Sequence, residues 1–166
     1  DIKVKNTMKA IEETLWVKTK IGGIARYEHD QYQRIGNDDT IPGNPWIICT
    51  MWMAQYYVST ARSVEDLERV VNSLRWTVSH ALPSGVLAEQ INPFTGEPVS
   101  VSPLTWSHAA VVQTVMDYLE KMQELHTCGQ CGRSIFRYDR AGRQQVRKHS
   151  LSHSGVIPDQ EHIHYL

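Results

Sequence analysis

The sequence lacks the features that mark several large classes of protein. No run approaches the roughly 18 uncharged apolar residues of a membrane-spanning helix, and no basic segment followed by an apolar leader is visible. Three cysteines among 166 residues are too few for a disulfide-stapled miniprotein. The formal net charge is −1, so no overall field attracts nucleic acid or an anionic membrane. We therefore expect a globular protein without a membrane partner and leave its location open, with the cytoplasm favoured.

The charges that are present are divided unevenly along the chain. Residues 1–125 contain 11 basic and 15 acidic residues, whereas residues 126–166 contain six basic and three acidic residues. The second segment also holds five of the eight histidines, two of the three cysteines and none of the five tryptophans. This change in composition predicts two units with a boundary near residue 125. The first residue is Asp1 instead of methionine, so we expect further sequence upstream.

Hydrophobic periodicity predicts four helices in the first unit, over about residues 6–16, 45–60, 63–80 and 103–116. The second and fourth carry no charged residue, which predicts burial on all sides. The third has apolar residues on one face and charged residues on the other, as a surface helix does. Two concentric rings of helices explain this alternation. The long loops 17–43 and 81–102 then lie at the same end, above the N-termini of the inner helices.

Polar residues mark the expected starts of these helices. Asn44 is a good N-cap, and Pro45 suits the first helical position because its missing N–H would be unpaired there. The serine and proline at 102–103 repeat this pattern before the fourth helix. Ser63 and Asp66 have the spacing of a capping box, with aspartate in place of glutamate. These signals place the N-termini of three of the four helices.

Several short segments of the first unit occur in the order and spacing of a known family. They are Gly23-Ile24-Ala25-Arg26-Tyr27-Glu28-His29-Asp30-Gln31-Tyr32, Gly43-Asn44-Pro45-Trp46, Gly85-Val86-Leu87-Ala88-Glu89-Gln90, Gly96-Glu97 and Leu104-Thr105-Trp106-Ser107. Together they resemble the C-terminal part of the catalytic domain of glycoside hydrolase family 15, the glucoamylase family, over roughly residues 5–125. The resemblance implies an all-α fold that forms part of an (α/α)6 toroid. It also implies that the parent enzyme hydrolyses α-glucosidic bonds of starch-like oligosaccharides with inversion.

The resemblance assigns roles to individual residues and implies no cofactor for catalysis. Glu89 matches the general base, and Ser100 matches the residue whose hydroxyl hydrogen-bonds that base. Arg26 matches an arginine that holds sugar hydroxyls, and its planar guanidinium can reach two adjacent hydroxyls. The remaining matches to the substrate pocket are Gln90, Tyr27, Tyr32, Trp46 and Trp106.

Plainer interpretations of the same residues stay open. Glu89 is also explained as a solvated loop carboxylate. Trp46 and Trp106 are each equally well explained as core residues in the first turn of a buried helix. Asp30 matches the family too, and we interpret it as a structural residue that hydrogen-bonds the loop backbone.

A second carboxyl group is missing from the expected site. An inverting glycosidase needs a general acid about 6.5–9.5 Å from the base, which leaves room for the attacking water. In the family that acid lies well upstream of residues 23–27. We therefore expect the missing N-terminal portion of the same enzyme to supply it and this chain alone to be inactive. Within the chain, Glu28 and Glu97 are the nearest candidates by position.

Two aspects of function stay open at this point. Maltose-type α-1,4, isomaltose-type α-1,6 and trehalose specificities all occur among members of the family, and these motifs do not separate them. The alternative function is a carbohydrate-binding or zinc-dependent interaction module without activity.

The basic second segment contains the spacing of a metal site. Its pattern is C-x2-C-x17-H-x3-H, which can close a tetrahedral zinc site. The four predicted ligands are Cys128, Cys131, His149 and His153. Two free thiols in a frayed extension are the alternative, and His162 and His164 are rival ligands. Nucleic acid is not expected as a partner, because the arginines of this segment have few aromatic residues beside them for base stacking.

Overall fold

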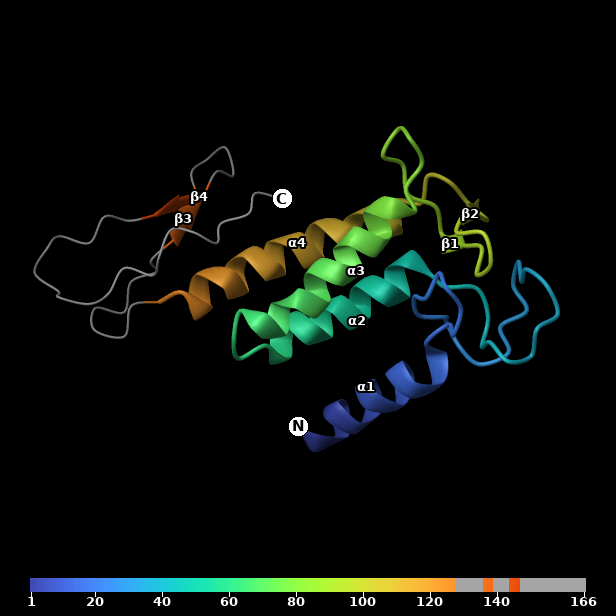
Figure 1. Ribbon diagram of the computed structural model, residues 1–166, viewed down its shortest axis with the longest axis horizontal. Helices are drawn as coiled ribbons and strands as arrows, with labels where there is room; N and C mark the ends of the chain where they lie inside the picture. Colours follow the sequence, from blue (N-terminus) through green and yellow to red (C-terminus); the bar gives the residue numbers. More distant parts are fainter. Residues whose placement is uncertain (128–135, 139–143, 147–166) are drawn as a thin grey trace, which may run out of the picture. The chain divides into compact units, whose positions relative to one another are not determined.

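The computed structural model describes residues 1–127, 136–138 and 144–146. The chain divides into two compact units, Asp1–Leu125 and His126–Leu166. The helices of the first unit are α1 (Ile2–Leu15), α2 (Ile47–Thr60), the short 3₁₀ helix η1 (Glu65–Leu67), α3 (Glu68–Ser79) and α4 (Thr105–Leu125) (Figure 1). The four predicted helices are therefore confirmed. Among the described residues, no helix has both the length and the apolar character needed to cross a membrane.

Helix α2 lies at the centre of the first unit. It contacts α1, α3 and α4, and it supplies Ile47 and Met51, both fully buried, to the main core. Polar side chains also join these helices, since Gln55 of α2 donates to the Thr114 hydroxyl of α4 at 3.2 Å. The core extends into the loops through the buried side chains of Ile24, Leu87 and Ile91.

The predicted capping box is present before α3. The Ser63 N–H donates to Asp66 Oδ2 at 3.1 Å, and the Asp66 N–H donates back to the Ser63 hydroxyl at 3.4 Å. The Arg62 N–H shares the same carboxylate oxygen at 2.8 Å. Three backbone N–H groups before α3 thus find side-chain partners, which is why the chain turns so tightly after α2.

The predicted start of α2 is wrong. This helix begins at Ile47, and its N-cap residue, Trp46, makes no side-chain cap. Residues 44–46 are extended instead, because Pro45 pairs with Ala25 and Trp46 pairs with Gln90 in isolated β-bridges. The side-chain amide of Asn44 forms hydrogen bonds with the loops and does not cap α2. Backbone pairing with two other segments therefore overrides the local helix-start signal.

The predicted start of α4 is wrong in a similar way. Pro103 is not its first helical residue, since α4 begins at Thr105. The Leu104 N–H instead donates to the Leu87 carbonyl at 3.0 Å, in the facing loop.

The two helices predicted to be buried on all sides are only partly buried within the described part of the chain. The residues of α4 that are buried are small, namely Ser107, Ala110 and Thr114. Large apolar side chains of α2 and α4 reach the surface, with Trp52 48%, Trp106 60% and Met116 59% exposed. No neighbouring element among the described residues covers this face.

The two long loops lie at the same end of the helices, where the N-termini of α2 and α4 meet (Figure 1). The second loop contains a hairpin that was not predicted, in which β1 (Gln90–Ile91) pairs antiparallel with β2 (Pro98–Val99). Strands of two residues are too short to show an alternating apolar pattern. The hairpin and the bridge from Trp46 to Gln90 attach the second loop to the first.

The second unit is described only in part. Its strand β3 (Phe136–Tyr138) pairs antiparallel with β4 (Gln144–Val146). The predicted zinc ligands lie outside the described residues, so the zinc site stays a prediction: Cys128, Cys131, His149 and His153. In the described part of the chain, no three histidine, cysteine or acidic side chains are grouped as a metal would require.

Candidate active site

The backbone of Glu89 is held between the start of α2 and the far end of its own loop. Its N–H donates to the Val101 carbonyl at 2.9 Å, and its carbonyl accepts the Ile47 N–H at 3.2 Å. One residue earlier, the buried Ser107 hydroxyl of α4 donates to the Ala88 carbonyl at 2.8 Å. Because N–H groups at the start of a helix have no partner within it, α2 gains an acceptor here as the loop gains an anchor.

The carboxylate of Glu89 is held at one of its two oxygens. Oε2 accepts the Ser100 hydroxyl at 2.5 Å and the Gln90 side-chain amide at 3.2 Å. Oε1 has no hydrogen bond to any described residue. Ser100 adopts a φ of 68°, in the left-handed region that residues with a Cβ rarely enter. Such strain is often found where a side chain must be aimed at a functional group.

A chain of buried amides extends from Glu89 into the first loop. Gln90 is fully buried, and its Oε1 accepts the Asn44 side-chain N–H at 2.8 Å. Asn44 in turn donates to the Gln33 carbonyl at 2.8 Å and accepts the Ile35 N–H at 3.0 Å. Gln90 therefore contacts protein groups and does not reach the surface at which a substrate would bind. The sequence analysis missed this arrangement, because it assigned Asn44 to the start of α2.

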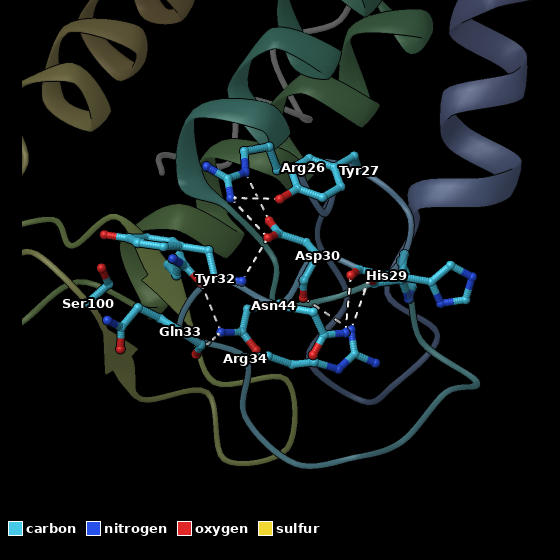
Figure 2. Close-up of polar contacts among 12 residues, drawn as sticks. Arg26, Tyr27, His29, Asp30, Tyr32, Gln33, Arg34, Asn44 and Ser100 are labelled. Carbon is cyan, nitrogen blue, oxygen red and sulfur yellow. Dashed lines mark hydrogen bonds and ion pairs between the residues drawn. The ribbon is translucent and has the colours of Figure 1, made fainter.

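Arg26 and Asp30 form a bidentate pair in the first loop (Figure 2). Arg26 Nε donates to Asp30 Oδ2 and Arg26 Nη2 to Asp30 Oδ1, both at 2.9 Å. Asp30 Oδ1 also accepts the Tyr32 N–H at 3.0 Å. Burial alone would raise the pKa of Asp30, but the hydrogen bonds from Arg26 and Tyr32 hold this pKa below its ordinary value. The same contact with Asp30 raises the pKa of Arg26.

Three aromatic rings surround the Arg26 guanidinium. Its Cζ lies 4.4 Å from the ring centroid of Trp46, 4.8 Å from that of Tyr27 and 5.2 Å from that of Tyr32. Trp46 is only 6% exposed, whereas Tyr27 and Tyr32 are about half exposed. The indole N–H of Trp46 is buried and has no hydrogen-bond partner among the described residues. Trp46 therefore belongs to the core and also packs against Arg26, and its place in the substrate pocket stays a prediction.

Trp106 stands apart from this cluster. It lies in the first turn of α4, is 60% exposed, and packs edge-on against Trp52 with ring centroids 5.8 Å apart. The interpretation of Trp106 as a core residue is therefore wrong within the described part of the chain.

Arg34 fastens the first loop and was missed by the sequence analysis (Figure 2). Its guanidinium donates to four backbone carbonyls, those of Asp30, Asp38, Ile41 and Pro42, at 2.7–3.3 Å. One side chain thus closes the segment from 30 to 42 into a ring. The role of Arg34 in closing the loop depends on where these carbonyls lie in the folded protein, and no sequence motif predicts it.

The two other acidic candidates do not join Glu89. Glu28 lines a small surface pocket with Thr14, His29 and Pro42, and Glu89 is not among its walls. Glu97 is exposed in the turn between β1 and β2, where its backbone N–H donates to the Thr95 hydroxyl at 3.3 Å. In the described part of the chain, neither side chain shares a hydrogen bond or an ion pair with Glu89.

A sequence model of glycosyl hydrolases family 15 matches residues 3–116. The chain belongs to this family. The match includes Glu89, Arg26 and the loops that carry them, and it stops before the second unit. Membership in the family and the superposition given below identify the fold of the first unit as part of a helical toroid.

Individual relatives agree with this assignment. An uncharacterized glycosyl hydrolase of Methanocaldococcus jannaschii is 32% identical over 66% of this chain and 17% of its own length. A trehalase of Mycolicibacterium smegmatis is 25% identical over 78% of this chain and 18% of its own length. The crystal structure of a bacterial glucoamylase complexed with acarbose superposes with a TM-score of 0.60 and 27% identity, covering 73% of this chain and 18% of that one. The chain therefore spans about a fifth of these relatives.

Proposed function

We propose that Glu89 is the general base of an inverting glycosidase that hydrolyses α-glucosidic bonds. The observation that carries this proposal is the asymmetry of its carboxylate. Oε2 is held by Ser100 and Gln90, whereas Oε1 has no protein partner among the described residues. A carboxylate fixed at one oxygen and open at the other is suited to binding and deprotonating a water molecule.

The chemistry follows from this geometry. Glu89 Oε1 takes a proton from water as the water oxygen attacks the anomeric carbon, and the bond from that carbon to the leaving oxygen breaks. A second carboxylic acid protonates the leaving oxygen in the same step. We place this acid in the part of the parent enzyme outside the present chain, because the resemblance to the family puts it well upstream of residues 23–27.

Arg26 is proposed to bind the hydroxyls of the sugar. Its side chain is 35% exposed, and Asp30 already occupies two of its nitrogens, Nε and Nη2. This pairing fixes the plane of the guanidinium and leaves Nη1 for a ligand. The half-exposed rings of Tyr27 and Tyr32 supply flat apolar surfaces of the kind that pack on a pyranose.

The experiment uses the full-length protein that contains this chain. We expect wild-type protein to release β-glucose from an oligosaccharide with α-glucosidic bonds, as followed by proton NMR during the first minutes. Maltose, isomaltose and trehalose are compared, because two relatives are named a glucoamylase and a trehalase. Glu89→Gln is expected to lose turnover by orders of magnitude while substrate still binds.

The matched control is Glu13→Gln, the same change at an exposed residue of α1 that pairs with Lys9 on the helix surface. This variant should retain wild-type turnover. Retention of the α configuration at the attacked anomeric carbon, or near-normal turnover by Glu89→Gln, would contradict the proposal.

A further inference from the structure

The orientation of the Asn44 amide is dictated by two backbone groups. A backbone N–H can only donate, so the side-chain atom that faces the Ile35 N–H must be Oδ1. A backbone carbonyl can only accept, so the atom that faces the Gln33 carbonyl must be Nδ2. Asn44 is 2% exposed, and water cannot exchange with these partners freely. Its amide therefore has one orientation, and a 180° flip would break both bonds.

The orientation of the Asn44 amide determines that of the Gln90 side-chain amide. The second hydrogen of Asn44 Nδ2 points at Gln90, so the atom that receives it must be the Gln90 oxygen. Gln90 is fully buried, which leaves its nitrogen facing Oε2 of Glu89 at 3.2 Å. Glutamine with no neighbour to orient it could equally turn its oxygen toward Glu89. An oxygen in that place would repel the carboxylate instead of binding it.

We propose that Asn44 is a positioning residue for Glu89 and acts through the side-chain amide of Gln90. This inference rests on the proposed function of Glu89 as the base. Asn44 lies 45 residues before Glu89 in the chain and does not contact it, yet it determines which atom of Gln90 the base meets. The relay also joins the first loop, which carries Arg26, to the hairpin, which carries Ser100.

The first test is Asn44→Asp in the full-length enzyme. Aspartate keeps the shape of asparagine and still accepts the Ile35 N–H, but it presents a second oxygen where Nδ2 was. Gln90 must then turn its nitrogen toward the new carboxylate and its oxygen toward Glu89. We expect kcat to fall about 10- to 100-fold, as misplacement of a catalytic group does. KM should change less than about twofold, because no contact with substrate is lost.

Gln90→Glu also replaces a side-chain amide by a carboxylate, at the residue that contacts Glu89 directly. Its first oxygen still accepts from Asn44, and its second oxygen faces Glu89. The same loss of kcat with unchanged KM is expected, from a substitution on a different segment of the chain. Should Asn44→Asp fail to fold, as judged by its melting curve, Gln90→Glu still tests the amide contact through which Asn44 acts, and a wild-type kcat in this variant would overturn the inference.

Asn92→Asp is the matched control. Asn92 lies in the same loop end, and its Oδ1 accepts the N–H groups of Phe94 and Thr95, which aspartate would also satisfy. Its kcat should match wild type. The inference is overturned if Asn44→Asp and Gln90→Glu keep the kcat of this control, or if they raise KM with kcat unchanged.

Failure of the proposed function gives a different result. In that case Glu89→Gln itself would retain turnover, or the wild-type enzyme would retain the α configuration at the attacked anomeric carbon. If Glu89→Gln abolishes turnover while Asn44→Asp and Gln90→Glu behave like Asn92→Asp, then Glu89 is the base and Asn44 has no part in positioning it.

Discussion

The guanidinium of Arg26 lies over the ring of Trp46, with 4.4 Å between Cζ and the ring centroid. The backbone of Trp46 pairs with that of Gln90, the residue next to Glu89. The proposed sugar-binding residue and the proposed base are therefore connected through a single buried tryptophan. We expect a substitution of Arg26 to change both substrate binding and turnover, and a substitution of Glu89 to change turnover while substrate still binds.

Arg26→Lys should weaken substrate binding and turnover together in the full-length enzyme. Lysine keeps the positive charge but has no planar set of donors to hold Asp30 and a sugar hydroxyl at once. We expect KM to rise and kcat to fall, each by about tenfold or more. Steady-state kinetics on the preferred disaccharide measure both. An unchanged KM and kcat would exclude Arg26 from the binding site.

Ser100→Gly should separate stability from activity. Glycine relieves the left-handed backbone at this position, where a side chain costs about 1–3 kcal/mol. The same change removes the hydroxyl that holds Oε2 of Glu89. We expect an unfolding midpoint in urea that is no lower than that of wild type, together with a kcat reduced about tenfold. If the unfolding midpoint in urea fell together with kcat, the hydroxyl of Ser100 would only support the fold.

Asp30→Asn should remove a pH-dependent part of the stability. The pKa of Asp30 is lowered in the folded protein, so its charge stabilises the fold above the ordinary carboxyl pKa of about 3.9. That contribution is lost as the pH falls through the lower pKa of the folded state. We expect wild type to exceed Asp30→Asn in urea stability at pH 6, with the difference shrinking below pH 4. A difference that grows on acidification would contradict the assigned sign.

Arg34→Lys should destabilise the first loop without altering the chemistry of the base directly. The single ammonium group of lysine cannot reach all four carbonyls that Arg34 holds, and each bond that is lost from a charged donor costs about 1.5–3 kcal/mol when its acceptor stays buried. We expect a loss of about 3 kcal/mol in the free energy of unfolding. Hydrogen exchange of residues 30–42 should accelerate, whereas exchange in α3 should not. Uniform acceleration would show that Arg34 supports the whole unit.

This chain expressed by itself should expose an apolar face. Trp52, Trp106, Val112 and Met116 are each about half exposed or more, and exposed apolar patches of this kind drive association. We expect self-association in analytical ultracentrifugation and strong binding of a hydrophobic dye, with no hydrolysis of maltooligosaccharides. Trp52→Gln with Trp106→Gln should reduce both. A monodisperse wild-type monomer that released β-glucose would contradict the prediction.

The helices were largely predictable from the sequence because they depend on local signals. The capping box of Ser63 and Asp66 is such a signal, and its hydrogen bonds are present as expected. Asn44 shows where local reasoning fails. Its neighbours Pro45 and Trp46 look like a helix start, but they pair with segments more than 15 residues away. Those pairings are invisible in a single sequence.

Family motifs in the sequence suffice to propose residues of the candidate site, whereas the tertiary contacts around these residues could not be predicted. The motifs led to Glu89 and Arg26, and the hydrogen bond from Ser100 to Glu89 has the expected partners. The contact between Asn44 and Gln90 spans 46 positions, and the four carbonyls of Arg34 are backbone groups without a sequence signature. The exposure of Trp106 depends on which neighbouring elements are present, and a run of apolar residues cannot reveal that.

The ring that Arg34 closes has a consequence for how this loop can vary. Its carbonyl partners at 30, 38, 41 and 42 bracket an exposed tip at residues 39–40. Loop tips that are isolated in this way tolerate insertion best. A short epitope or a lengthened turn placed at 39–40 would break the hydrogen bonds from Thr40 and Ile41 to Asp38, yet it should leave Asp30 and Asn44 where they are. The loop thus offers a position for surface immobilisation at the loop end of the helices.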